Sequence, residues 1–407
     1  MKKPIRLAVL LDQKIHAGGG YQQALNAALQ VKRLPTDLVE PVYFTTVYEN
    51  LSNLAKFGVV AHLIRLNIFM RVWLRLHATF GDYFLFRFLK IFQVFNYFEI
   101  IFLKAEIDLI YFLSPNAYAQ TLEKLNYITT VWDLCHRDYP EFPEVRWNRE
   151  FEIREAIYRS ILPRAFAVLV DSDLGKHNIV KRYGTDETRV HVMPFEASQG
   201  SRSDNTINKP DPFNVLTKYQ LIHPYVFYPA QFWAHKNHVY LLEGLKELEL
   251  LYGVKLSAIF SGSDKGNMHY IAEYANKLFI SDRVRFAGFV SDEEMTTLYK
   301  QSVALVMPTY FGPTNLPPIE AFELGVPVLY PDTVGLREQV DGAALLLDLK
   351  RPRSLASQLF RLLSEPNLKN QLVNAGKQRI SYLNQIDRTQ ILQSILEEFI
   401  CRRITWA

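Results

Sequence analysis

The segment Thr309–Glu320 (TYFGPTNLPPIE) has the residue types and spacing of an anion-binding turn. It follows an expected buried strand, and a helix is expected to begin near Leu316, with Thr314 or Asn315 as its N-cap. The free N–H groups and positive dipole end of a helix N-terminus bind anions, and proline in the first turn costs no backbone hydrogen bond. Glu320, about one turn into the helix, is placed to accept hydrogen bonds from the vicinal hydroxyls of a ribose or hexose. An ordinary capped helix, in which Glu320 complements the dipole, fits the same residues equally well.

Three other loops carry residues that suit a phosphate. Lys236 lies in Gln231–His238, between an expected strand and an expected helix, as a point charge for a diphosphate. Gly262 and Ser263 directly follow a third expected strand, where a glycine lets the backbone approach a nucleotide closely. A glycine triplet between the first strand and the first helix offers its backbone in the same way: Gly18, Gly19 and Gly20. Each loop also fits an ordinary surface turn, so the prediction depends on their combination.

Two further polar residues, Asp133 and His136, come directly after the expected strand Ile128–Trp132. This is the end of a strand at which α/β enzymes place reactive groups. His136 could donate to a sugar hydroxyl or transfer a proton. A loop histidine bonded to a nearby carboxylate explains the same residues. The sequence shows no P-loop, nucleophile elbow or metal-ligand spacing, so we expect no metal and no cofactor.

These loops separate strand-like and helix-like segments that alternate along the chain. In the first half, strands are expected at 6–11, 41–47, 108–113, 128–132, 167–171 and 190–193, with helices at 21–32, 150–161 and 174–183. In the second half, strands are expected at 225–229, 255–261, 284–286, 304–307 and 328–330, with helices at 238–252, 268–278, 293–301 and 317–324. This alternation is typical of α/β domains with parallel sheets. A polar segment with two prolines, 201–214, is the best linker, and two such domains usually bind a ligand in the cleft between them.

The composition limits the class of protein. The chain has 407 residues, of which 49% are hydrophobic and 22% charged, so it is long enough for two domains and too apolar to be largely disordered. Only two cysteines, Cys135 and Cys401, are present, which excludes a disulfide framework and fits a reducing compartment. The apolar run after the N-terminus is too short for a signal peptide, and no stretch is long enough for a transmembrane helix.

One segment, 56–104, differs from the rest in composition. It holds seven cationic and two anionic residues, a net charge of +5, whereas the whole chain carries +4, and thirteen of its residues are aromatic. Such a segment suits an anionic membrane surface, with Arg65, Arg71 and Arg75 as candidate membrane or acceptor contacts. A buried helical hairpin whose arginines extend to water fits as well. Nucleic acid is not expected as a partner, because no nucleic-acid-binding motif accompanies the charge.

Four segments in order resemble the family 4 glycosyltransferases, which have the two-domain GT-B fold. They are Tyr228–His238 (YPAQFWAHKNH), Phe260–Asn267 (FSGSDKGN), Asp282–Ser302 and Phe311–Val328, the last with the motif GPTNLPPIEA. The resemblance covers essentially the whole second half. In the first half it depends on the glycine triplet and the segment from Asp133 to Pro143, and 50–105 has no clear counterpart.

The resemblance implies an α/β protein of GT-B fold, with two Rossmann-like domains facing each other across a cleft. An N-terminal acceptor-binding domain is expected at 1–200, a linker at 201–214 and a nucleotide-sugar-binding domain at 215–385. The final helix, 386–407, would cross back to the first domain. The implied activity is retaining transfer of a hexose from a nucleotide diphosphate sugar to a glycan or lipid-linked acceptor, in surface polysaccharide synthesis. The implied location is the cytoplasm or the inner face of the cytoplasmic membrane.

The resemblance also implies a role for each candidate residue. Lys236 would bind the diphosphate and Glu320 the donor ribose, while His136 would lie near the donor sugar. Backbone groups would line the phosphate and the sugar, from Thr314, Asn315 and Leu316 on one side and Gly19 and Gly20 on the other.

Two positions depart from the family pattern. Gly312 stands where the family usually has a glutamate that contacts the donor sugar, and Gln231 stands roughly where an arginine usually precedes the phosphate lysine. Gly312 keeps open the alternative of a non-catalytic sugar-nucleotide-binding protein, and a GT-B-fold nucleotide-sugar epimerase is a second alternative. An epimerase would convert a nucleotide sugar without any acceptor, which separates it from a transferase.

Overall fold

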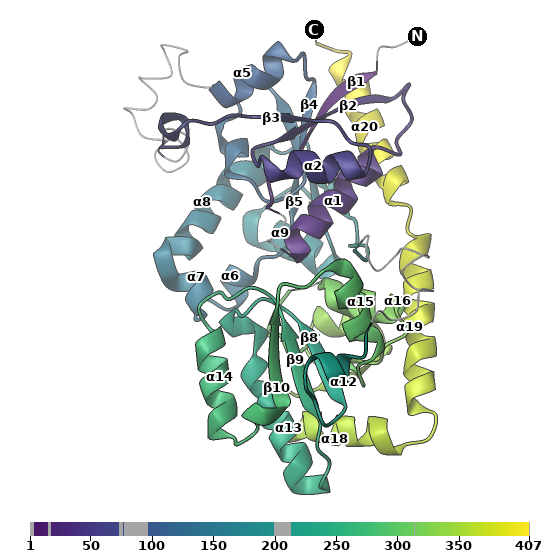
Figure 1. The fold of residues 1–407 in the computed structure, drawn as a ribbon. Coiled ribbons are helices and arrows are strands. Elements are labelled where there is room, and N and C mark those ends of the chain that lie inside the picture. Colours follow the sequence, from purple (N-terminus) through teal and green to yellow (C-terminus); the bar gives the residue numbers. More distant parts are fainter. Residues whose placement is uncertain are drawn as a thin grey trace. The chain divides into compact units, whose positions relative to one another are not determined.

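The structure is a computed structural model that describes residues 4–14, 18–72, 76, 97–198, 213–312 and 314–406. Its elements are drawn in Figure 1. The chain divides into two compact units: unit 1 comprises Met1–Glu141, Val145–Pro194 and Asp387–Ala407, and unit 2 comprises Phe142–Glu144 and Phe195–Ile386. Apart from the short segment Phe142–Glu144, the chain passes into unit 2 after Pro194 and returns to unit 1 after Ile386. The linker was predicted at 201–214, of which 201–212 lie outside the described residues.

Unit 1 is built on a parallel sheet of seven strands in the order β3-β2-β1-β4-β5-β6-β7. The strands are β1 Ile5–Leu10, β2 Val39–Thr45, β3 Ala61–Leu63, β4 Leu109–Phe112, β5 Asn126–Val131, β6 Ala167–Val170 and β7 Val190–Val192. The helices are α1 Gly19–Val31, α2 Glu49–Lys56, α5 Tyr97–Lys104, α6 Cys135–Asp138, α8 Glu150–Ile161, α9 Asp173–Tyr183 and α20 Arg388–Arg403. A further helix, α7 Pro143–Arg146, begins in the Phe142–Glu144 segment of unit 2 and ends in unit 1. Short 3-10 turns connect them at Ala117–Thr121, Trp147–Arg149, Leu162–Arg164 and Glu187–Arg189.

The sheet of unit 1 is buried on both faces. Along β1, Leu7 and Val9 belong to one core cluster and Ala8 and Leu10 to the other, because successive side chains of a strand point to opposite faces. The first cluster includes side chains of α1 together with four from the C-terminal helix α20: Leu392, Ile395, Leu396 and Phe399. Part of this core is therefore supplied by the end of the chain.

Unit 2 is built on a parallel sheet of six strands in the order β10-β9-β8-β11-β12-β13. The strands are β8 Tyr225–Pro229, β9 Ser257–Ser261, β10 Val284–Gly288, β11 Leu305–Val306, β12 Val328–Pro331 and β13 Ala344–Leu347. The helices are α12 Val215–Lys218, α13 His238–Tyr252, α14 Met268–Lys277, α15 Asp292–Lys300, α16 Leu316–Glu323, α17 Leu336–Val340, α18 Pro352–Ser364 and α19 Leu368–Gln385, with 3-10 turns at Ala234–Lys236 and Ser281–Arg283.

The predicted alternation of strands and helices is confirmed in both units. Each expected strand is present, with bounds that shift by at most two residues, and α8 and α13 have the bounds that were expected. Two strands were not predicted. β3 has only three residues, too few for a periodic pattern, and is defined by its pairing with β2. β13 is a short apolar run that pairs with β12 at the edge of its sheet. Within the described part of the chain, no helix combines the length and hydrophobicity needed to cross a membrane.

Candidate functional site

Three neighbouring strands of unit 2, β9, β8 and β11, end at the candidate anion-binding loops. Because the strands are parallel and adjacent, their carboxyl ends lie at one edge of the sheet. The 3-10 turn with Lys236 follows β8, the loop with Gly262 follows β9, and the segment leading to α16 follows β11. The fold thus brings together the three loops of unit 2 that the sequence singled out.

Lys236 lies at the N-terminal end of α16. Its Nζ donates to Asn315 Oδ1 at 3.2 Å, and its carbonyl accepts a hydrogen bond of 2.8 Å from the hydroxyl of Tyr228. Asn315 is the N-cap position of α16. The ammonium group and the positive end of the helix are therefore directed to the same place, which suits a diphosphate.

Asn315 occupies the predicted cap position, but its side chain makes no capping hydrogen bond within α16. The amide nitrogen Nδ2 donates instead to the carbonyl of Gly312 at 2.8 Å and to the hydroxyl of Tyr330 at 2.6 Å. A side-chain cap would accept from the second or third residue of α16, but these are Pro317 and Pro318, which have no backbone N–H, so Leu316 supplies the N–H of the first turn.

Gly312 has a backbone conformation that favours glycine. Its φ is +111°, a conformation that side chains disfavour, and a Cβ there would lie 2.8 Å from Asn315 Oδ1. A side chain at this position would thus collide with the amide that contacts Lys236. Of the neighbouring candidates, Leu316 is the buried first residue of α16, and Thr314 is partly exposed beside it.

Gly262 marks a close approach between the loops after β8 and β9. A Cβ at Gly262 would lie 2.4 Å from the carbonyl oxygen of Ala230. The backbone N–H of Phe232 also donates to the carbonyl of Ser263 at 3.1 Å. Glycine at position 262 therefore allows the loop after β9 to pack closely against the loop after β8, which carries Lys236.

Glu320 lies one turn inside α16 and is 9% exposed. Its Oε2 accepts a hydrogen bond of 2.9 Å from the hydroxyl of Tyr299. Burial raises the pKa of the Glu320 carboxyl, although hydrogen bonds from Ser198 and Tyr299 act in the opposite direction. The carboxyl is thus bonded to hydroxyl groups, the same kind of donor that a ribose presents.

A pair that the sequence did not reveal, Glu144 and His235, lies beside the Lys236 loop. Glu144 Oε1 accepts a 2.9 Å hydrogen bond from the backbone N–H of His235 and also contacts its Nδ1. Burial opposes ionisation of Glu144, but these bonds outweigh it and lower its pKa. The His235 ring stacks on Phe311, with centroids 3.9 Å apart, and the His235 carbonyl accepts from the N–H of Tyr310 at 2.9 Å. No local pattern could have predicted a contact between residues 91 positions apart.

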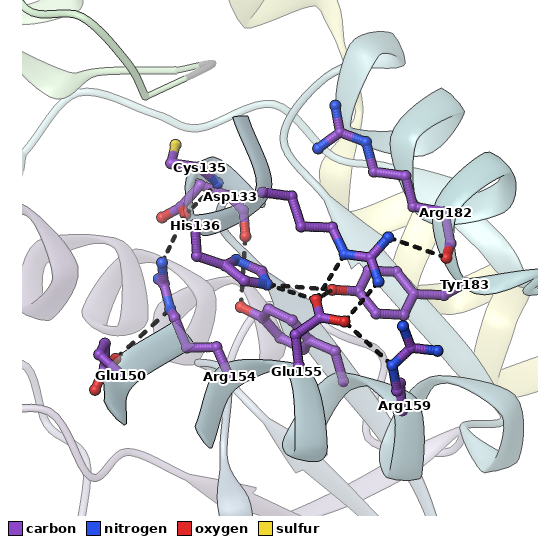
Figure 2. A network of polar contacts seen from close by, with 11 residues as sticks. Asp133, Cys135, His136, Glu150, Arg154, Glu155, Arg159, Arg182 and Tyr183 are labelled. Atoms are coloured by element: carbon purple, nitrogen blue, oxygen red, sulfur yellow. Dashed lines mark hydrogen bonds and ion pairs between the residues drawn. The ribbon is translucent and has the colours of Figure 1, made fainter. Parts of the chain in front are cut away.

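In unit 1, His136 is fully buried and bonded to a carboxylate. Figure 2 shows its ring meeting Glu155 and Tyr183, with Nε2 at 2.9 Å from Glu155 Oε1 and 3.3 Å from the Tyr183 hydroxyl. Burial lowers the pKa of His136, although the bond to Glu155 opposes this, so the ring is neutral near pH 7. Among the described residues, Nδ1 has no hydrogen-bond partner. The contact of His136 with a donor sugar stays a prediction.

Asp133 lies directly after β5 and is held by two groups. Its Oδ1 accepts from the backbone N–H of Cys135 at 3.0 Å and lies 3.3 Å from Nη1 of Arg154 (Figure 2). Burial opposes ionisation, but the charge of Arg154 and the Cys135 hydrogen bond outweigh it, so the pKa of Asp133 is lowered. Asp133 is therefore an anion at neutral pH, and its catalytic role stays a prediction.

The glycine triplet lies at the start of α1, as predicted. Gly18 is the N-cap with φ +64°, Gly19 begins the helix, and a Cβ at Gly20 would lie 3.0 Å from the Trp132 ring. Near the same strand end, Asp12 Oδ1 accepts from the hydroxyl of Ser114 at 2.9 Å and its Oδ2 from Nδ2 of Asn116 at 2.6 Å. Burial raises the pKa of Asp12 to about 6. The position of Asp12 directly after the first strand is a local signal in the sequence for this site.

Of the predicted membrane contacts, Arg65 and Arg71 are exposed, and Arg75 lies outside the described residues. Large apolar side chains among the described residues of the same stretch are also exposed, including Val60, Ile68, Phe69 and Val72. Elsewhere, the described residues contain no group of three or more His, Cys, Asp or Glu side chains that could hold a metal ion.

Residues 220–379 match the family model described as glycosyl transferases group 1. O-antigen chain mannosyltransferase B of Escherichia coli is 26% identical over 254 residues, which are 62% of this chain and 64% of that protein. D-inositol 3-phosphate glycosyltransferase of Corynebacterium jeikeium is 24% identical over 233 residues, 54% of this chain and 55% of that protein. The chain thus spans between half and two thirds of the length of these relatives, and the matches support the predicted class of enzyme, a glycosyltransferase.

Solved structures share the fold over nearly the whole chain. HepE of Anabaena, in complex with UDP and glucose, has a TM-score of 0.70 at 14% identity and covers 98% of this chain and 100% of its own. WaaG, a glycosyltransferase involved in lipopolysaccharide biosynthesis, has a TM-score of 0.68 at 12% identity and covers 96% of this chain and 99% of its own. These similarities confirm the predicted α/β fold class, GT-B, with a parallel-sheet Rossmann-like domain in each unit.

Proposed function

We propose that this chain is a retaining glycosyltransferase that moves a hexose from a nucleotide diphosphate sugar to an acceptor hydroxyl. The observation that carries the proposal is the position of Lys236, whose Nζ lies 3.2 Å from Asn315 Oδ1 at the N-terminus of α16. A diphosphate is attracted by both the ammonium group and the helix end. Glu320, one turn further on, offers its carboxyl to the ribose. These residues lie within the segment that matches the glycosyltransferase family model.

In the proposed reaction, the bond between the sugar and the nucleoside diphosphate breaks, and negative charge develops on the departing phosphate. Lys236, the N–H of Leu316 and the positive dipole end of α16 stabilise that charge, which lowers the barrier. The described residues of these loops offer no carboxylate placed as a nucleophile, and Gly312 stands where a glutamate would be expected. We therefore favour attack by the acceptor on the face that the phosphate leaves, with that phosphate taking the acceptor proton. A trapped covalent glycosyl-enzyme would contradict this mechanism.

The proposed acceptor is a glycan or a lipid-linked sugar in surface polysaccharide synthesis. Support comes from the relatives, which include an O-antigen chain mannosyltransferase of E. coli and one of Salmonella typhimurium. We assign acceptor binding to unit 1, near the carboxyl ends of its strands, where Gly18–Gly20, Asp133 and His136 lie.

We also propose that part of unit 1 docks on an anionic membrane surface. Exposed cations, Lys56, Arg65, Arg71 and Lys104, accompany exposed apolar side chains such as Ile68 and Phe69. This combination suits an interface with anionic lipids. The enzyme would then meet a lipid-linked acceptor at the cytoplasmic face of the membrane.

A thermal-shift screen with UDP, GDP, dTDP and ADP sugars tests the activity and identifies the donor. A ligand at a hundredfold excess over its dissociation constant stabilises the folded protein by about 2.7 kcal/mol, so the correct donor should raise the melting temperature clearly. The donor that binds is then incubated with and without acceptor. Conversion of the nucleotide sugar without acceptor would indicate an epimerase instead, and no binding by any of the four would contradict the proposal.

A further inference from the structure

We propose that Gln339 and Tyr330 are positioning residues for the donor diphosphate. Both are uncharged, and they act through other residues rather than by binding the diphosphate themselves. They hold Asn315, and through Asn315 they hold Lys236, in the arrangement that receives the diphosphate. The inference rests on the proposed function, because it concerns the same donor site.

Gln339, on α17, forms hydrogen bonds with both backbone groups of Asn315, and we call this pair of bonds the clamp. Its Oε1 accepts from the N–H of Asn315 at 3.0 Å, and its Nε2 donates to the carbonyl of Asn315 at 2.6 Å. One planar amide thus satisfies both backbone groups of the residue that precedes α16. With two bonds at opposite ends of a rigid amide, the peptide planes next to the helix start have a fixed orientation.

Tyr330, at β12, connects this clamp to the side chain of Asn315. Its hydroxyl donates to Gln339 Oε1 at 2.8 Å and accepts from Asn315 Nδ2 at 2.6 Å. The bond to Nδ2 turns the opposite atom of the amide, Oδ1, toward Lys236 Nζ at 3.2 Å. A continuous chain of hydrogen bonds therefore runs from Gln339 through Tyr330 and Asn315 to Lys236.

The clamp has a firm base and little access to water. Arg379 donates to the carbonyl of Gln339 at 2.9 Å and to that of Glu338 at 2.8 Å, which fixes the end of α17. Asn315 and Gln339 are 8% and 9% exposed, and Tyr330 is fully buried. Removing one partner would leave buried backbone groups unsatisfied, so Asn315 would have to move to recover hydrogen bonds.

A matched clamp elsewhere in unit 2 makes the proposal specific. Gln301 Oε1 accepts from the N–H of Val215 at 2.8 Å, and its Nε2 donates to the carbonyl of Phe213 at 2.9 Å. Gln301 therefore makes the same kind of two-way backbone contact, but at residues to which no donor contact is assigned.

The experiment measures nucleotide affinity in the full chain by calorimetry, with UDP and GDP as probes. Gln339→Met, which keeps the length of the side chain, should bind the favoured nucleotide about tenfold more weakly. Tyr330→Phe, a milder change that keeps the ring, should bind it a few-fold more weakly. Gln301→Met should lose comparable thermal stability and bind within about twofold of the wild type.

A double-mutant cycle with Lys236→Met separates positioning from general loosening of the fold. If Gln339 acts through Asn315 on Lys236, the loss caused by Gln339→Met should shrink markedly when Lys236 is already absent. In turnover with a donor sugar, Gln339→Met should raise the donor KM more than it lowers kcat. The reason is that the clamp positions Lys236 for the diphosphate in the ground state as well as in the transition state.

Any of three results would overturn the inference alone: wild-type nucleotide affinity in both Gln339→Met and Tyr330→Phe, an equal loss of affinity in Gln301→Met, or full additivity of Gln339→Met with Lys236→Met. Failure of the wild-type chain to bind either nucleotide, or any nucleotide sugar, would instead overturn the proposed function on which the inference depends.

Discussion

At the scale of single residues, the candidate site is defined by a few polar groups with unequal surroundings. Lys236 is partly exposed at the N-terminus of α16, whereas Glu320 is buried and bonded to Tyr299. The first suits a charged ligand that enters from water. Glu320 suits the hydroxyl groups of a ligand. A buried carboxyl that gives up its bond to Tyr299 needs another hydrogen-bond donor in its place, and a sugar hydroxyl is such a donor.

Replacing Lys236 by methionine should weaken donor binding strongly with little effect on folding. A hydrogen bond to a charged group contributes about 1.5–3 kcal/mol, so the dissociation constant of the nucleotide should rise at least about tenfold. Calorimetry with the nucleotide found in the donor screen measures this. Lys277→Met, at the exposed end of α14, is the control and should bind normally. Equal affinity of the Lys236 variant and the wild type would remove Lys236 from the site.

The raised pKa of Asp12 predicts a pH dependence of stability. Its folded value of about 6 lies above the ordinary value of 3.8, so the folded state holds a proton that the unfolded state releases between these pH values. The contribution of Asp12 to stability is therefore greatest below pH 4 and declines as the pH rises to about 6.

Denaturant unfolding of Asp12→Asn between pH 4 and pH 7 measures this contribution. The difference in stability between the variant and the wild type should shift in favour of the variant as the pH rises. The control is Asp37→Asn, which removes a carboxyl from an exposed turn; the same trend in that variant would show that the effect is not specific to Asp12. A pH-independent difference for Asp12→Asn would show that its carboxyl does not titrate in this range.

At the scale of elements, the site is a strand, a tight turn and a helix whose start is held from several sides. The turn after β11 needs glycine at 312, where a side chain would meet Asn315. The loop after β9 needs glycine at 262, where a side chain would meet Ala230. Glycine at these two positions lets backbone segments approach closely, which is what a phosphate-binding surface made of N–H groups requires.

Gly312→Ala should lower both stability and donor affinity. The positive φ alone costs about 1–3 kcal/mol for a residue with a side chain, and the new Cβ would also press on Asn315 Oδ1 at 2.8 Å. Gly266→Ala is a matched control, because Gly266 also has positive φ, +96°, but nothing lies within 4 Å of its Cβ position. Both variants should lose stability, and only Gly312→Ala should lose nucleotide affinity. Normal affinity of Gly312→Ala would separate this loop from donor binding.

At the scale of the whole molecule, the two units differ in the segments of the chain that form them and in the candidate residues that they carry. Unit 2 holds all the donor-site candidates of the second half. Unit 1 is completed by the end of the chain, since Leu392, Leu396 and Phe399 of α20 are buried in its core. Unit 1 also carries the exposed cationic and apolar residues of the segment 56–104.

Sedimentation with liposomes tests the proposed membrane contact. The purified chain should bind vesicles of anionic phospholipid at low salt and bind them less as salt rises, because the attraction is electrostatic. Arg65→Ala/Arg71→Ala should weaken binding by about 1 kcal/mol per charge. The control, Lys369→Ala/Lys377→Ala on α19, removes the same charge from an exposed surface of unit 2. Equal loss in both variants would indicate a general charge effect, and no binding at low salt would refute the contact.

The residues of the sequence determined the parallel α/β architecture and the identity of the loops that carry Lys236, Gly262 and Asn315. Both properties are local, because periodic apolar residues and turn residues act within a few positions of the chain. The sequence could therefore indicate which loops follow the strands. It could also indicate that these loops lie at one edge of the sheet, because the strands are parallel.

Only the tertiary structure decided what each loop residue contacts. The bonds from Gln339 to Asn315 span 24 positions and the bond from His235 to Glu144 spans 91. It also placed His136 in a buried network with Glu155 and Tyr183. Such pairs depend on the register and packing of elements far apart in the chain, because a side chain can bond only to the groups that folding brings within about 3 Å of it.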